Sequence, residues 1–192
     1  MSSSYKSNVN FGDIISSVTF GLNPKKIVEF GILNGFSLEN FVKASNTDCK
    51  IEAYDIFEDF NGNHAEYDKI NTMFNKNKNL KIKKGDFYEL LDNFEDNSVD
   101  IIHIDIANTG DTYKYAIDNY MNKLTKNGLM LLEGGSDARD NVYWMKKYNK
   151  TKIVPVLEEY KKDYNIMVID NINDKTDTNN SSHFGCITLI KK

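Results

Sequence analysis

The sequence predicts an α/β protein, with a doubly wound, mostly parallel sheet covered by helices on both faces. Short apolar runs recur along the 192 residues, and segments with helical periodicity separate them. That alternation is typical of right-handed βαβ units. The runs at 101–104 and 129–132 are almost wholly apolar apart from His103, as expected for strands that are buried on both faces.

Seven strands are expected, and they span residues 26–31, 50–55, 80–84, 99–105, 129–133, 164–170 and 186–190. Pro24 marks the entry to the first strand, and the segment 1–24 is expected to be helical before it. The last two strands have only a polar loop, 171–182, between them. They can therefore pair antiparallel, or lie apart with another strand between them. No second-domain boundary is visible, which favours a single domain over 1–192.

The helix between the fourth and fifth strands has the clearest pattern. Its N-terminus is expected at a cap formed by Asp111 or Thr112. Its end is expected at Asn127-Gly128, because glycine is favoured just past a helix. Side chains at helical spacing would form its buried face, namely Tyr113, Ala116, Ile117, Tyr120, Met121 and Leu124.

Composition and charge limit the class of protein. The chain has 24 lysines and arginines against 28 acids, with a pI near 5.4, which argues against a nucleic-acid binder. No apolar run approaches the roughly 20 residues of a membrane span, and the N-terminus lacks the pattern of a secretory signal. Cys49 and Cys186 have no metal-binding spacing and are expected to be free thiols. These features predict a soluble, cytoplasmic protein.

A glycine bend after the first strand is the most informative motif. The strand carries Glu29 near its end, Gly31-x-x-x-Gly35 follows, and a helix then begins. Proteins of the α/β class hold nucleotide-like ligands at such a junction, at the carboxyl edge of the sheet. The bend lacks the Gly-x-Gly-x-x-Gly pattern that admits a pyrophosphate. It therefore favours a ligand without phosphate and makes a nicotinamide-dependent oxidoreductase a distant alternative.

Acidic residues recur where the first five expected strands end. They are, in chain order, Glu29, Asp55, Asp86, Asp105 and Glu133. Because the carboxyl ends of parallel strands meet at one edge, these acids should form a negative rim. Such a rim repels phosphate and attracts a cation, an ammonium group or a ribose diol. Asp55 lies where a carboxylate binds ribose in dinucleotide folds, although it could also cap a helix, and Asp86 could be a turn residue.

Together, these motifs resemble those of class I S-adenosylmethionine-dependent methyltransferases. The family's first motif is matched by Val28-Glu29-Phe30-Gly31-x-x-x-Gly35-x-Ser37, and its adenine-edge motif by Gly85-Asp86-Phe87. Residues 99–105 resemble its fourth strand, and 127–132 the lead into its fifth. The sequence is most similar to the macrocin and catechol-like group of small-molecule O-methyltransferases. The resemblance implies a Rossmann-like, seven-stranded sheet with an antiparallel last strand.

By this resemblance, the cofactor is S-adenosylmethionine. Glu29 and Gly31 would face its methionine part. Asp55 would bind its ribose, and Asp86 with Phe87 its adenine. The complete set of implied cofactor contacts is Glu29, Gly31, Asn34, Gly35, Ser37, Asp55, Ile56, Asp86, Phe87 and Asp105.

Asp105 and Glu133 are the catalytic candidates, because a base must accept the proton of the methyl acceptor. His103 and His183 are weaker candidates, and His103 is expected to be a core histidine. Metal-dependent relatives carry about Asp-Gly-Asp-His after the fourth strand, and Asp-Asn or His-Asp after the fifth. Here the corresponding residues are Asp105-Ile106-Ala107-Asn108 and Glu133-Gly134-Gly135. No metal site is therefore predicted, although two carboxylates with water could still hold Mg²⁺.

The expected activity is transfer of a methyl group to an oxygen, less readily a nitrogen, of a small molecule or sugar. Ser136 and Arg139 either contact this substrate or belong to a helix cap. A homodimer is left open, and neither nucleic acid nor membrane is an expected partner. One alternative is an RNA ribose or cap methyltransferase, which would need a Lys-Asp-Lys-Glu set and a basic groove. Another is a catalytically silent module of the same fold that binds the cofactor or a partner.

Overall fold

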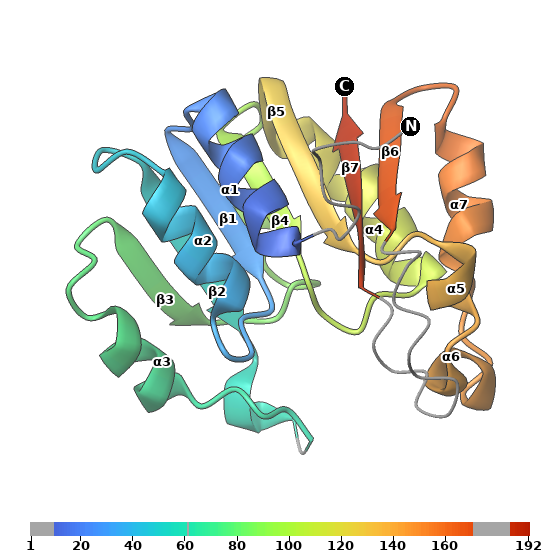
Figure 1. The fold of residues 1–192 in the computed structure, drawn as a ribbon, viewed down its shortest axis with the longest axis horizontal. Coiled ribbons are helices and arrows are strands. Elements are labelled where there is room, and N and C mark those ends of the chain that lie inside the picture. The colour runs from blue at the N-terminus through green and yellow to red at the C-terminus, as the bar shows by residue number, and fades with distance from the viewer. Residues whose placement is uncertain (1–9, 61, 171–184) are drawn as a thin grey trace, which may run out of the picture.

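The computed structural model describes residues 10–60, 62–170 and 185–192, and its centre is one seven-stranded sheet (Figure 1). The strand order is β3-β2-β1-β4-β5-β7-β6. β7 runs antiparallel to both of its neighbours, β5 and β6, and the four other strand pairs are parallel. The strands are β1 (Lys26–Phe30), β2 (Lys50–Asp55), β3 (Leu80–Lys84), β4 (Val99–Ile104), β5 (Leu124–Glu133), β6 (Asn165–Asp170) and β7 (Cys186–Lys191). The predicted fold class is confirmed.

Helices cover both faces of the sheet. Figure 1 shows α1 and α2 in front of the strands and α4 behind them. The face of α1 and α2 also receives α3, and the face of α4 receives α7. The helices are α1 (Phe11–Leu22), α2 (Phe36–Ala44), α3 (Tyr67–Phe74), α4 (Gly110–Tyr120), α5 (Asp137–Asp140), α6 (Tyr143–Lys147) and α7 (Ile153–Tyr160). Short 3₁₀ turns lie at Phe57–Asp59, Leu91–Asn93 and Met121–Lys123.

Alternation along β1 divides the core into two halves. Val28 and Phe30 pack toward α4, where the ring of Phe30 meets Tyr120 edge to face at 5.2 Å. Ile27 packs toward α1 and α2. Glu29 points to the same face as Ile27 because side chains alternate along a strand. The sequence therefore sends a carboxylate into an apolar layer, where it requires polar partners.

The junction between α4 and β5 differs from the prediction. The helix begins at Gly110, and its cap is Thr109, whose hydroxyl accepts a hydrogen bond from Thr112 N at 3.3 Å. Asp111 does not cap the helix, because its carboxylate accepts a hydrogen bond from Thr151 Oγ1 instead.

The predicted end of α4 is also wrong. The helix ends at Tyr120, and Asn127-Gly128 lies within β5. The strand begins early because Leu124 is fully buried and pairs in register with Val99 of β4. The tertiary pairing of this segment thus overrides the local helix-stop signal.

The structure settles the arrangement of the last two strands and locates the N-terminal helix. β6 and β7 pair directly and antiparallel, which is the first of the two predicted arrangements. The predicted helical segment 1–24 contains α1, while residues 1–9 lie outside the described residues. The predicted loop 171–182 and His183 also lie outside them.

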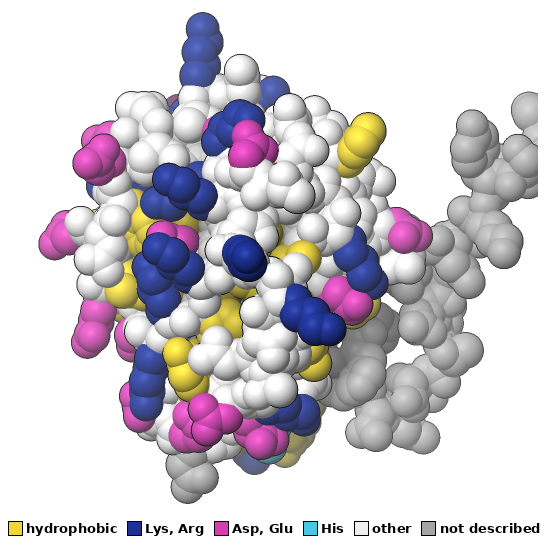
Figure 2. All heavy atoms as spheres, turned by 90° about the vertical axis from the view of Figure 1, so that its left-hand side faces the viewer, with side chains coloured by type: hydrophobic (Ala, Val, Ile, Leu, Met, Phe, Trp, Pro, Cys, Tyr) yellow, Lys and Arg dark blue, Asp and Glu magenta, His cyan; other side chains and the backbone are white. Residues whose placement is uncertain are grey.

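Charged side chains protect the edge of the sheet at β3. Lys83 pairs with Glu52 at 3.4 Å, and Lys84 pairs with Asp59 at 2.6 Å. Figure 2 shows this side of the molecule, where basic and acidic side chains are interspersed over the surface. Lysines on an edge strand disfavour pairing with another chain.

Among the described helices, none has both the length and the apolar character that crossing a bilayer requires.

We predict that Gly31→Ala destabilises the fold by about 3 kcal/mol or more, because the position needs a left-handed backbone and close packing. Gly31 has φ of +87°, and an added Cβ would lie 1.9 Å from the carbonyl oxygen of Asp105. The control is Gly21→Ala, since Gly21 in α1 has open space around its Cα. That change should stabilise the helix by about 0.5 kcal/mol. Urea unfolding of both variants measures the difference, and equal stabilities would contradict the prediction.

Candidate functional site

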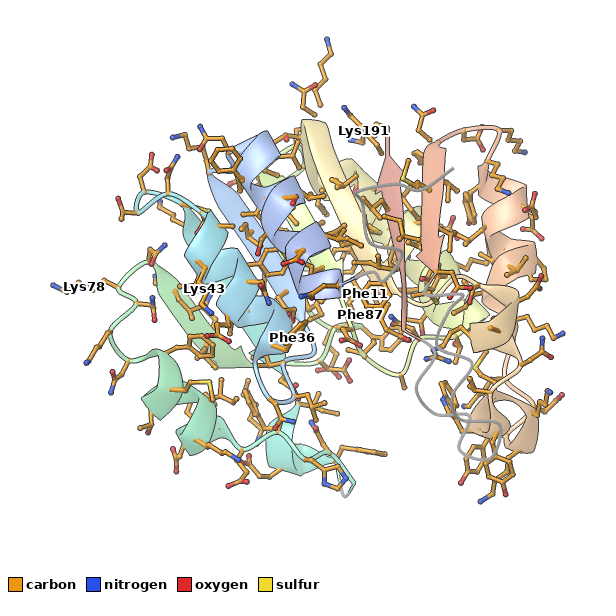
Figure 3. All side chains as sticks on the ribbon, in the orientation of Figure 1. Phe11, Phe36, Lys43, Lys78, Phe87 and Lys191 are labelled. Atoms are coloured by element: carbon orange, nitrogen blue, oxygen red, sulfur yellow. The ribbon has the colours of Figure 1, made fainter. Side chains whose placement is uncertain are left out.

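Two adjoining cavities lie at the carboxyl edge of the parallel strands. The larger is about 510 Å³ and the smaller about 290 Å³. Asp105, Ile32 and Leu33 line both. Figure 3 shows the labelled phenylalanines at this edge, with Phe11 and Phe36 coming from α1 and α2, and Phe87 from the loop after β3. The cavities therefore meet at the glycine bend after β1 and the end of β4.

Most of the predicted site residues reach these cavities. Those lining the larger cavity are Gly31, Asp55, Ile56, Asp86, Phe87 and Asp105. Those lining the smaller cavity are Asn34, Ser37, Asp105 and Glu133. Two predicted residues line neither: Gly35 is the N-cap of α2, with φ of +76°, and Glu29 is fully buried beneath the smaller cavity. The structure thus brings the acids of the predicted rim to one edge.

The bend itself is held by backbone contacts that leave no room for a side chain. Gly31 N donates to Tyr54 O of β2 at 2.9 Å, and Asp105 N donates to Phe30 O at 2.8 Å. Gly35 N closes the turn by donating to Ile32 O at 2.7 Å. These bonds fix the start of α2 against the ends of β2 and β4, so the bend and Asp105 keep a constant spacing.

Asp55 anchors the bend through its carboxylate. Oδ2 accepts a hydrogen bond from Ile32 N at 2.7 Å and lies 3.5 Å from Leu33 N. Oδ1 accepts from Phe57 N at 2.8 Å and from Asn63 Nδ2 at 2.6 Å. The backbone contacts are structural, whereas the Asn63 amide is a side chain that a ligand hydroxyl could replace. Asp55 therefore both shapes the bend and faces the larger cavity.

Asp105 is the acid with the most unusual environment. Asp105 lines both cavities and is an exposed residue, although the protein atoms around the cavities partly desolvate its carboxyl. Burial raises the pKa of Asp105 to about 6, and the negative charges of Glu133 and Glu29 add to the increase. The charge of His103, which is the second-largest influence after burial, lowers the pKa, and Arg139 lowers it less, but together they do not cancel the increase. A carboxyl with this pKa can accept a proton near neutral pH.

Glu29, His103 and Ser37 form a buried polar cluster beneath the smaller cavity. Glu29 Oε1 accepts a hydrogen bond from the Ser37 hydroxyl and lies 3.0 Å from His103 Nδ1. Burial lowers the pKa of His103, but the hydrogen bond and charge of Glu29 outweigh it, so the pKa is raised. The imidazole also meets the ring of Phe41 edge to face at 5.5 Å. The cluster thus gives the Glu29 carboxyl two polar partners inside the core, the Ser37 hydroxyl and the His103 imidazole.

Glu133 is paired with Arg139 of α5. Arg139 Nε donates to Oε1 at 2.7 Å, and Nη2 donates to Oε2 at 2.9 Å. The guanidinium also lies over the ring of Trp144, 4.9 Å from its centroid. Ser136 caps α5 by accepting a hydrogen bond from Arg139 N at 3.2 Å. Both oxygens of Glu133 are thus engaged, which leaves Asp105 as the acid better placed to accept a proton.

The donor set at this edge does not fit Mg²⁺. The two candidate ligands would be Asp105 and Glu133, but Arg139 holds both oxygens of the second. Ile106, Gly134 and Gly135 supply no further side-chain oxygen. Within the part of the chain that the structure describes, no group of three metal-ligating side chains is found. A metal would have to displace a bidentate, mostly buried guanidinium.

Several lining residues were not assigned from the sequence, among them Tyr88, Asn63 and Phe11. Tyr88 follows the predicted Phe87 in the sequence, and both line the larger cavity. Its position next to Phe87 was the signal that could have identified it as a site residue. Asn63 reaches Asp55 because the loop after β2 folds back over the cavity. Phe11 enters the smaller cavity from the first turn of α1. For Asn63 and Phe11, no local pattern marks the contact.

Comparison with known proteins gives one family match. The sequence model of the family described as "Methyltransferase domain" matches residues 28–133. This segment runs from β1 to the end of β5 and includes the bend, Asp55, Asp105 and Glu133. No curated protein matches the chain significantly.

Solved structures share the whole fold. A Klebsiella pneumoniae protein described as a candidate O-methyltransferase superposes with a TM-score of 0.70 and 12% identity, covering 98% of this chain and 82% of that one. A Bacillus cereus O-methyltransferase in complex with SAH superposes with a TM-score of 0.65 and 13% identity, covering 98% of this chain and 84% of that one. A third structure is the O-methyltransferase TomG of Streptomyces achromogenes, which is involved in tomaymycin synthesis and was solved in complex with SAM. It superposes with a TM-score of 0.62 and 13% identity, covering 94% of this chain and 78% of that one. At sequence identities of 12–13%, the similarity to these solved structures shows that the fold is shared and nothing more specific.

We predict that Arg139→Met lowers the free energy of unfolding by about 1–3 kcal/mol, because it leaves the Glu133 carboxylate without its cation. The double variant Arg139→Met/Glu133→Gln should recover part of this loss. A double-mutant cycle in urea at pH 7, with Glu133→Gln as the second single variant, measures the coupling. A coupling near zero would show that the ion pair does not hold α5 to β5.

Proposed function

The chain belongs to the methyltransferase-domain family, and from this premise we propose that it transfers a methyl group from S-adenosylmethionine to an oxygen of a small molecule. The observation that carries the proposal is the meeting of two cavities at Asp105, one next to the ribose-type acid Asp55 and one above the buried cluster of Glu29. A nucleoside that carries a charged amino-acid tail has two chemically different ends, and each end would suit one of the two cavities.

The larger cavity is suited to the adenosine part. Its walls are largely apolar and aromatic, and Phe87, Tyr88 and Ile56 are among the residues that line it. Flat purine rings are bound well by such walls. Asp55 would accept hydrogen bonds from the ribose hydroxyls in exchange for the one from Asn63. Asp86, whose carboxylate accepts from Tyr88 N at 2.9 Å, lines the same cavity at the adenine edge.

The smaller cavity is suited to the methionine part. Ser37 and Asn34 line it at the start of α2, and Phe11 and Phe36 supply apolar contacts. Asp105 stands at the junction of the two cavities. When bound there, S-adenosylmethionine supplies an electrophilic methyl group on a sulfonium centre. The negative charge of Asp105 would favour that cation, and the fixed bend would align it with the acceptor.

Asp105 would also accept the proton of the acceptor hydroxyl. The bound cofactor would supply the methyl group and, as the acceptor oxygen bonds to the methyl carbon, its sulfur would keep the electron pair of the broken carbon–sulfur bond. The hydroxyl proton passes to the Asp105 carboxylate, so charge and atoms balance. Glu133 is less suited to this step because Arg139 engages both of its oxygens.

The preference for a small acceptor rests on the site and on its structural neighbours. The neighbours named above are described as O-methyltransferases, which supports oxygen as the accepting atom. RNA is disfavoured, because neither cavity has a lysine or arginine among its described lining residues.

The first test is binding of SAH, the demethylated product, measured by isothermal titration calorimetry. We predict saturable binding to one site, and at least tenfold weaker binding to Asp55→Ala, which loses the ribose acceptor and the anchor of the bend. Asp48→Asn is the matched control, since Asp48 is exposed and pairs only with Lys25 among the described residues. Absence of binding to the unaltered protein would overturn the proposed function.

The second test is the pH dependence of turnover. Below about pH 6, Asp105 is protonated and cannot accept a proton, so kcat/KM should rise with pH and level off above it. Asp105→Asn should lower kcat about 100-fold or more. The measurement is SAH formation with a panel of hydroxylated small molecules. If no acceptor yields SAH although SAH binds, the silent-module alternative gains support, and a flat pH profile would exclude Asp105 as the base.

A further inference from the structure

The edge strand β6 lies at the opposite end of the sheet from β3 (Figure 1). Lysines with acidic partners protect the β3 edge. β6 (Asn165–Asp170) contains no lysine, arginine, proline or glycine, and it pairs with β7 in an unbroken register over all six residues. It therefore lacks the lysines, prolines and bulges by which proteins usually prevent an edge strand from pairing with another chain.

The hydrogen bonds of β7 show which backbone groups of β6 point outward. Gly134 N donates to Cys186 O at 2.9 Å, so Cys186 directs its N–H and C=O toward β5. Directions alternate along an antiparallel strand, so the odd-numbered residues of β7 bond to their odd-numbered partners in β6. The even-numbered residues of β6 therefore point their N–H and C=O groups away from the sheet. They are Ile166, Val168 and Asp170, and no backbone partner for them is found among the described residues.

The side chains along this edge are apolar and partly exposed. Met167 is 60% exposed and Val168 is 37% exposed, while Ile166 and Ile169 are half-buried. Ile169 belongs to the half of the core under α1 and α2, and Ile166 to the half under α4. Because side chains alternate along a strand, both faces of β6 present apolar area that a further strand would cover. Asp170, at the end of β6, is its one ionisable side chain.

A second copy of β6 is the partner that matches this edge. A two-fold axis perpendicular to the sheet makes the two strands antiparallel and keeps their faces in common. With the axis at Met167, Ile166 lies opposite Val168 of the second copy, and each such pair can exchange two hydrogen bonds. Met167 then meets its own copy. Asp170 meets Tyr164 of the second copy instead of a like charge, so no repulsion opposes the pairing.

We propose that the β6 edges of two copies of this chain pair antiparallel across a two-fold axis at Met167, which joins their sheets into one. A single pair of short strands buries less than the roughly 1,200 Å² of a stable interface, so we expect a dimer that dissociates at about 10 μM. No residue of β6 is among the described lining residues of either cavity. Both copies would therefore keep their sites open.

The first test is sedimentation equilibrium of the full chain between about 1 and about 200 μM, which should show a monomer–dimer equilibrium. Met167→Lys should raise the dissociation constant at least about tenfold, because it places two ammonium groups opposite each other at the axis. The matched control is Met73→Lys, since Met73 of α3 is 54% exposed and lies outside this edge. A chain that stays monomeric throughout would overturn the inference and indicate that another segment or another protein covers the edge. An equal effect of the two variants would also overturn it.

The second test fixes the position of the axis. Residue 167 and its copy would form a non-hydrogen-bonded pair with Cα atoms about 4.5 Å apart, a separation that suits a disulfide. Met167→Cys should therefore yield a disulfide-linked dimer under mild oxidation, whereas Met73→Cys, at a similarly exposed position, should not. The two native cysteines are buried. Dimers that form without preferential cross-linking at position 167 would show that a different surface joins the copies.

Discussion

The close contact between Gly31 and the carbonyl of Asp105 is the constraint on which the site depends. β1 and β4 are neighbours, and the chain leaving β1 at Gly31 lies against the backbone of Asp105 at the end of β4. Only a residue without Cβ fits there, since an added carbon would lie 1.9 Å from the Asp105 oxygen. The same contact brings Asp105 to the point where the two cavities join. The backbone contact that fixes the glycine bend therefore also fixes the position of Asp105 in the candidate site.

The acids of the edge are neutralised in different ways, and this differentiates their roles. Backbone amides and Asn63 surround Asp55. Glu29 is paired with an imidazole, and Glu133 with a guanidinium. Asp105 alone faces both cavities without a cation of its own in direct contact among the described residues. Of the three acids that line the smaller cavity or lie beneath it, Asp105 is therefore the one whose charge is available to a bound cation where the two cavities join.

The sheet was predicted well because strands that are buried on both faces are almost wholly apolar, and this pattern is visible in the sequence. The apolar runs of β4 and β5 end at the acids, so the edge of the sheet could be predicted as well. The α4–β5 junction failed because Asn127-Gly128 is a strong local signal that pairing of Leu124 with Val99 overrides. The acids were visible as a set, but their partners were not. Contacts such as those of His103 and Asn63 arise only when distant segments fold together.

The guanidinium at the end of β5 also bears on which acceptors suit the proposed reaction. Arg139 supplies a fixed positive charge to Glu133, but a guanidinium cannot lower the pKa of a bound hydroxyl as a Lewis acid does. In the proposed reaction, removal of the acceptor proton would fall to Asp105, whose pKa of about 6 makes it a weak base. A phenol, with a pKa near 10, is better matched to such a base than an aliphatic alcohol, because proton transfer is less uphill. The Arg139–Glu133 pair makes Glu133 unavailable as a metal ligand. The proposed reaction is therefore better suited to acceptors with an acidic hydroxyl.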